Sequence, residues 1–196
     1  MEVVFTLPYP EYSVTKELTN HFKKKHGYSV LIPVSRQQKG YDLMVYNQKT
    51  GRSITIQVKS SRTYEGTEPK KQTKNRKYRY NTWFNTFGVG DTPCDFYVLF
   101  GLYSKLIGKG VKKLDKSRKV SKWYDVVLLA FSGKEMSKFL KGLRQKKSNK
   151  QDSKFGFGFD TPKEIYHNRG QGDKEAPLIK NHLFNVMVSK MLIKLK

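Results

Sequence analysis

The sequence predicts an α/β fold in which a central mixed β-sheet is flanked by helices. An amphipathic helical pattern near the N-terminus is followed by three strand-like segments. Two apolar segments with strand character come later, and further helical patterns follow them. A chain of 196 residues can form one domain with a sizeable core but is short for two. We therefore expect a single domain over residues 1–196.

The first helix is expected from about Glu11 to Lys25, where Gly27 supplies a good residue for ending it. Three apolar residues at helical spacing form its buried stripe: Val14, Leu18 and Phe22. At about 100° per residue, Glu11 falls inside this stripe. A carboxylate there either complements the positive end of the helix dipole or serves a functional site.

Three strands are expected next, over residues 28–34, 40–46 and 54–61. The last two form a hairpin, because the turn residues Thr50 and Gly51 lie between them. Folding this hairpin brings Asp42 opposite Gln57, within one residue. Since side chains two apart share a face, Gln57 and Lys59 project together beside Asp42. A carboxylate, an amide oxygen and an ammonium group in one place can hold a divalent cation and a phosphate.

Asp42, the turn and the run Gln57-Val58-Lys59 resemble the signature of the PD-(D/E)XK nuclease superfamily in its Gln-x-Lys variant. Tyr41 replaces the usual Pro, and Gln57 replaces the second acid. The resemblance implies a restriction-endonuclease-like core and an Mg²⁺ ion, which Mn²⁺ could replace. It assigns the metal to Asp42 and Gln57, with Glu11 as a further ligand or water-orienting group, and the phosphate to Lys59. The alternative is an ordinary amphipathic hairpin that exposes a lysine.

A basic insert is expected at about residues 62–91, after the hairpin. Its central part mixes cations with aromatic rings and contains no acid, which suits phosphate contact and base stacking. We predict that eight of its residues bind DNA: Lys70, Lys71, Lys74, Arg76, Lys77, Tyr78, Arg79 and Tyr80. The alternative is a solvated loop beside a small cluster formed by Trp83, Phe84 and Phe87, and we expect at least two of the insert's aromatic residues to be packed.

Buried strands are expected over residues 95–106 and 123–131, separated by a basic excursion. Ser132 and Glu135 have the spacing of a capping box, which predicts a helix ending near Leu143. Residues 144–154 read as a charged linker and residues 162–177 as loop. Between them, residues 155–160 alternate Phe with Gly and predict only a weak strand. A C-terminal helix is expected over residues 178–195.

Composition points to a polyanionic partner. The net charge is +23, from 39 Lys and Arg against 16 Asp and Glu, which favours nucleic acid. Cys94 is the one cysteine, which fits a reducing compartment, and we expect it to be a buried small residue. No signal peptide or membrane span is expected, so we predict a cytoplasmic protein without membrane contact. The four histidines lack the spacing of a zinc site.

Taken together, these features predict an Mg²⁺-dependent, restriction-like DNA endonuclease that hydrolyses phosphodiester bonds in duplex DNA. Cutting both strands would require a homodimer. One alternative is a junction-resolving or repair nuclease that recognises DNA structure. Another is a DNA-binding protein on the same fold without catalysis, and a third is an RNA-binding or ribosome-associated protein.

Overall fold

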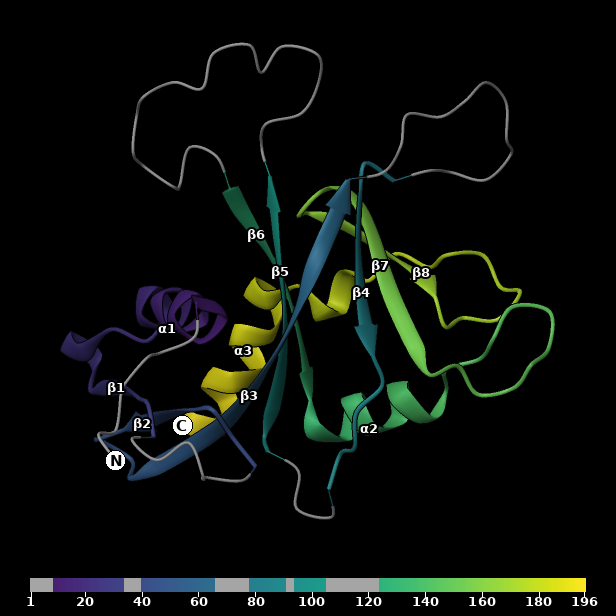
Figure 1. The fold of residues 1–196 in the computed structure, drawn as a ribbon. Coiled ribbons are helices and arrows are strands. Elements are labelled where there is room, and N and C mark those ends of the chain that lie inside the picture. Colours follow the sequence, from purple (N-terminus) through teal and green to yellow (C-terminus); the bar gives the residue numbers. More distant parts are fainter. Residues whose placement is uncertain (1–8, 34–39, 66–77, 91–93, 105–123) are drawn as a thin grey trace, which may run out of the picture.

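The computed structural model describes residues 9–33, 40–65, 78–90, 94–104 and 124–196, and it has the mixed α/β architecture that the sequence predicts (Figure 1). The first elements follow the expected order of one helix and three strands. They are α1 (Tyr9–His21), a short 3-10 turn (Lys24–His26), β1 (Tyr28–Leu31), β2 (Leu43–Asn47) and β3 (Arg52–Glu65). Gly27 ends the 3-10 turn with a φ of 89°, a conformation that glycine adopts without strain.

The main sheet has the order β1-β2-β3-β5-β6. Strands β1, β2 and β3 form an antiparallel meander. The next strand, β5 (Phe96–Ser104), runs parallel to β3, and β6 (Tyr124–Ser132) returns antiparallel to β5. Both strands are the apolar segments identified in the sequence, and β5 is buried along most of its length.

A second sheet begins at the C-terminal end of β3. Residues 63–65 pair with β4 (Tyr80–Asn85), which pairs with β7 (Lys154–Thr161), and β8 (Glu164–Arg169) completes the sheet. All these pairs are antiparallel. Two predictions need correction here, because β4 lies inside the expected insert and β8 lies inside the expected loop. Both strands form because they bury alternate residues, such as Thr82 and Phe84 in β4.

Two hydrophobic cores cover the two faces of the main sheet. On one face, α1 and α3 (Phe184–Leu195) pack on a cluster that includes Ile54, Ile56 and Phe100. The opposite face carries Tyr97 and Leu99, which pack with the second sheet and with α2 (Gly133–Lys141). Figure 1 shows the same order, with α1 and the strands β4, β7 and β8 on opposite sides of β5.

The capping box predicted for α2 is confirmed. The Ser132 hydroxyl accepts a hydrogen bond from the Glu135 N–H, and the Glu135 carboxylate accepts one from the Ser132 N–H at 2.8 Å. The C-terminal helix begins at Phe184, later than expected, because Leu178 bridges to Tyr166 of β8 and residues Lys180–His182 form a 3-10 turn. None of the described helices is long and apolar enough to span a bilayer.

Candidate functional site

Asp42 is held at the start of the β2–β3 hairpin by two backbone contacts. Leu43 pairs with Ile56, which brings Asp42 level with Gln57, as the sequence predicts. The Asp42 N–H donates to the Ile56 carbonyl oxygen at 2.9 Å. Its carboxylate Oδ2 accepts the N–H of Val58 at 2.7 Å. Asp42 is therefore held on either side of Gln57, through its N–H at Ile56 and through its carboxylate at Val58.

Gln57 and Lys59 share the face of β3 that lies away from α1. Ile54 and Ile56 enter the core under the helices, and the alternation of a strand sends the odd-numbered side chains the other way. Gln57 pairs with Tyr97 and Lys59 with Leu99, both of which belong to the core on that side. Asp42 immediately precedes Leu43, the first residue of the β2–β3 pairing, and both Asp42 and Gln57 lie beside Cys94.

Glu11 is placed differently. It is half-buried in the first turn of α1, where its charge complements the helix dipole. The helix packs through Val14 and Leu18 on the Ile56 face of the sheet, which is the face opposite Gln57 and Lys59. This packing does not bring Glu11 together with the other three predicted residues.

The residues present at Asp42 fit a hard divalent cation with few protein ligands. Among the described residues, Asp42 Oδ1 and the Gln57 side-chain amide form no hydrogen bond. In the part of the chain that the structure describes, there is no cluster of three or more His, Cys, Asp or Glu residues that could hold a metal ion. A cation here would have one carboxylate and one amide oxygen, completed by water and phosphate. Mg²⁺ tolerates such a site, because it keeps several waters and binds through one or two carboxylates.

Cys94 lies beside this site but has the properties of a structural residue. It is buried, and its thiol donates to the Phe96 carbonyl oxygen at 3.0 Å. Burial raises the pKa of the thiol to about 11, so the group stays protonated at neutral pH. The prediction of a buried small residue is confirmed.

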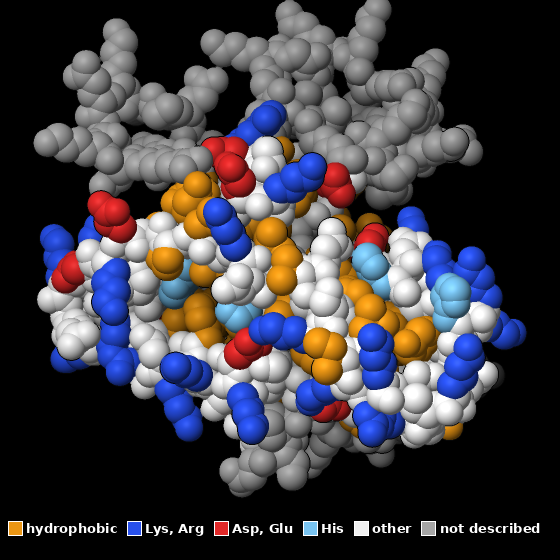
Figure 2. All heavy atoms as spheres, turned by 180° about the vertical axis from the view of Figure 1, so that it is seen from behind, with side chains coloured by type: hydrophobic (Ala, Val, Ile, Leu, Met, Phe, Trp, Pro, Cys, Tyr) orange, Lys and Arg blue, Asp and Glu red, His pale blue; other side chains and the backbone are white. Residues whose placement is uncertain are grey.

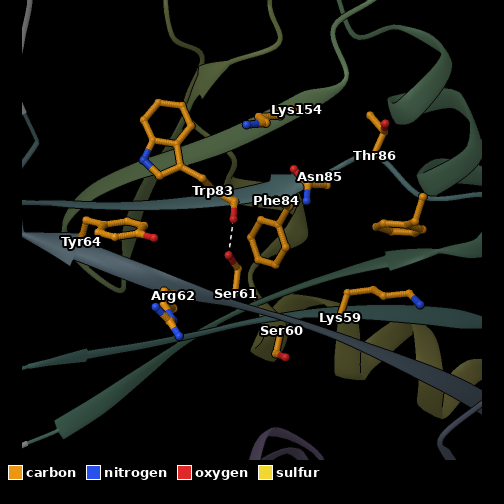
Figure 3. A pocket seen from close by; sticks show the side chains of 11 residues that line it. Lys59, Ser60, Ser61, Arg62, Tyr64, Trp83, Phe84, Asn85, Thr86 and Lys154 are labelled. Atoms are coloured by element: carbon orange, nitrogen blue, oxygen red, sulfur yellow. Dashed lines mark hydrogen bonds between the residues drawn. The ribbon is translucent and has the colours of Figure 1, made fainter.

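Lys59 also lines a cleft of about 610 Å³ between β3 and β4 (Figure 3). The Lys59 ammonium lies 5.2 Å from the centre of the Phe87 ring, a cation–π distance. The cleft contains two further cations, Arg62 and Lys154, and no carboxylate among its lining residues. Aromatic rings line it as well: Tyr64, Trp83, Phe84 and Phe87. The Ser61 hydroxyl donates to the Trp83 carbonyl oxygen and joins the two strands at its base.

Arg62, Tyr64 and Lys154 were not among the predicted site residues. A signal for a longer strand was available, since β3 continues through Ser61-Arg62-Thr63-Tyr64 without a turn residue, but regular alternation would place Arg62 and Tyr64 on the face opposite Lys59. Lys154 had no such signal. It reaches the cleft because β7 pairs with β4, and Lys154 pairs with Asn85, 69 positions earlier in the chain.

The predicted DNA-binding segment is described only at its end. Five of its residues lie outside the described part of the chain: Lys70, Lys71, Lys74, Arg76 and Lys77. Arg79 is exposed, with its guanidinium 5.6 Å from the centre of the Tyr80 ring. Tyr78 and Tyr80 are buried, and their rings stack on Tyr166 and Phe159. As core residues, these two tyrosines do not offer free faces to bases, which corrects their predicted role and confirms that at least two aromatics of the insert are packed.

Positive charge is spread over the surface rather than confined to one segment. Figure 2 shows Lys and Arg side chains distributed across one face of the molecule, with fewer Asp and Glu among them.

No protein-family model matches the chain, and a search of curated proteins gives no match. The functional argument therefore depends on the site itself.

Proposed function

We propose that this protein is a metal-dependent DNA endonuclease of the PD-(D/E)XK type, with Asp42, Gln57 and Lys59 at its active site. The observation that supports it best is the placement of Asp42. Its carboxylate is fixed at the level of Gln57 by the Val58 N–H, on the face from which Lys59 also projects. The net charge of +23 supports a nucleic-acid substrate.

Each residue has a distinct role in this proposal. Asp42 Oδ1 and the Gln57 amide oxygen would hold Mg²⁺ and orient it, while Asp42 Oδ2 remains bound to the backbone. The bound cation would lower the pKa of a water molecule and neutralise charge on the scissile phosphate. Lys59 would bind a non-bridging phosphate oxygen and stabilise the negative charge that develops there. The Lys59 ammonium lies 5.2 Å from the centre of the Phe87 ring, and both side chains line the cleft.

One observation favours a second candidate, a DNA-binding protein on the same fold without catalysis. The chain supplies one carboxylate where the strict signature has two, and the packing of α1 keeps Glu11 on the opposite face. Fewer negative charges weaken cation binding. Under this alternative the protein binds DNA equally well with and without Mg²⁺.

Nicking of supercoiled plasmid in the presence of Mg²⁺ tests the proposal. Asp42→Asn keeps an oxygen for the Val58 N–H but removes the charge, and we expect nicking to fall at least 100-fold. Lys59→Ala should have an effect of similar size. Asp173→Asn and Lys16→Ala make the same chemical changes at exposed positions outside the proposed site and should nick like the wild type. Nicking that survives Asp42→Asn would refute the site, and a wild type that binds but never nicks would favour the second candidate.

A further inference from the structure

The cleft beside Lys59 has charges that no described acid neutralises. Arg62 and Lys154 are both exposed and line the cleft together with Lys59. Neither the Arg62 guanidinium nor the Lys154 ammonium forms an ion pair with a described residue. Three cations that line one cleft without a carboxylate form a site for anions such as phosphate.

Two aromatic side chains lie at the end of the cleft away from Lys59 (Figure 3). Tyr64 on β3 is 54% exposed, so its ring is accessible to a ligand in the cleft. Trp83 on β4 is half-buried, and its indole lies across Gly156, where a Cβ atom would come within 2.6 Å of the ring. The Arg169 guanidinium lies 5.6 Å from the centre of the same ring.

The size of the cleft limits what can enter it. A volume of about 610 Å³ falls in the range of sites that hold one small molecule. A base that remains stacked inside a duplex cannot enter such a hollow, so a nucleotide in it must be unpaired or flipped out. An aromatic ring beside cations is the combination with which proteins bind single strands, because every base has a face that can stack.

We propose that this cleft binds an unpaired nucleotide of the DNA substrate, with the base on Tyr64 and its phosphates on Arg62 and Lys154. The inference rests on the proposed function in taking DNA as the substrate and Lys59 as the group at the scissile phosphate. Tyr64 is five residues from Lys59 on one strand, a span of about 17 Å. The substrate class is therefore DNA with a bulge, flap or single-stranded end a few nucleotides from the cut, rather than a fully paired site.

Equilibrium binding in EDTA separates this proposal from cleavage. Fluorescence anisotropy would compare a fully paired duplex, the same duplex with one bulged nucleotide, and a single strand as DNA and as RNA. The wild type should prefer the bulged duplex by about 5- to 150-fold, the contribution of one stacked base. Tyr64→Ala should abolish this preference. Tyr12→Ala removes a tyrosine of similar exposure (58%) on α1 and should keep it.

The phosphate contacts can be tested separately, through the salt dependence of binding. On single-stranded DNA the salt dependence has a slope of about −0.7 for each neutralised phosphate. The double variant Arg62→Ala/Lys154→Ala should reduce the slope by about 1.4, whereas Lys16→Ala/Lys138→Ala, which removes two exposed lysines on helices, should leave it unchanged.

Three results would overturn the inference: equal affinity for paired and bulged duplexes, a preference that persists in Tyr64→Ala, or tighter binding of the RNA strand than of the DNA strand. Its failure is distinguishable from failure of the nuclease. A protein that lacks the preference but nicks plasmid through Asp42 has the proposed activity without this cleft site. A protein with a Tyr64-dependent preference and no nicking has the binding site without the activity.

Discussion

A single buried histidine should make the stability of this protein depend on pH. His167 on β8 is 7% exposed, and its ring centre lies 4.9 Å from that of Phe139 and 5.7 Å from that of Phe157. Its Nε2 atom has no hydrogen-bond partner in the described part of the chain. Burial lowers the pKa of the imidazole from 6.5 to about 4, against an opposing hydrogen bond with the backbone of Arg169.

The sign and the size of the effect follow from linkage. The folded-state pKa is below the unfolded value, so between pH 6.5 and about 4 the unfolded chain binds more protons than the folded one. Stability from the neutral His167 is therefore fully present above pH 6.5 and is lost as the pH falls towards 4. At 1.36 kcal/mol per pKa unit, the loss is about 3 kcal/mol.

The assay is urea unfolding followed by circular dichroism at pH 7 and pH 4, for the wild type and His167→Leu. The free-energy difference between them should change by about 3 kcal/mol across this range in favour of the variant, because the variant has no imidazole to protonate. Groups that titrate in both proteins, such as His182 and Glu135, cancel in this comparison. His26→Gln, at an exposed position, is the control and should show no such change. If the difference between wild type and His167→Leu is the same at both pH values, the burial argument is refuted.

Two further predictions concern the proposed site and the basic segment. Gln57→Glu should tighten Mg²⁺ binding by roughly tenfold or more, because it adds a second negative charge beside Asp42; an unchanged Mg²⁺ affinity by calorimetry would contradict the metal assignment. The triple variant Lys74→Ala/Arg76→Ala/Lys77→Ala removes three cations of the basic segment. It should lower affinity for all duplex sequences together and flatten the slope of log K against log salt by about two to three units. A slope equal to that of the wild type would contradict this prediction, and the DNA surface would then lie on other lysines.

The features that the sequence predicted well are those determined by near neighbours. The capping box at Ser132 depends on one residue three positions on, and the level of Asp42 against Gln57 depends on a short turn. Both are geometric consequences of local spacing. The two strands of the hairpin were found for the same reason, since buried residues recur at alternate positions in each: Leu43 and Val45 in β2, and Ile54 and Ile56 in β3.

The second sheet could not be predicted in this way. Gly156 and Gly158 suggested a weak strand, because glycine adds no side chain to pack. In β7 their lack of a Cβ makes room for neighbouring rings: a Cβ at Gly158 would come within 2.0 Å of Tyr78, and one at Gly156 within 2.6 Å of Trp83. These rings come from positions more than 70 residues earlier. A local pattern cannot show such a contact, so Tyr78 and Tyr80 resembled exposed stacking residues.

The long strand β3 explains why the proposed active site and the proposed nucleotide cleft lie side by side. Its first half pairs with β2 and β5, which fixes Gln57 and Lys59, and residues 63–65 then pair with β4 in the second sheet. A strand that leaves one sheet for another must separate its neighbours, and the space between β4 and the main sheet is the cleft. Lys59 is still paired with β5 and lies four residues before the pairing with β4 begins at Thr63, so the backbone that would position it for a phosphate leads directly into the cleft. The proposed active site and the proposed nucleotide site thus follow from one change of strand partner in β3.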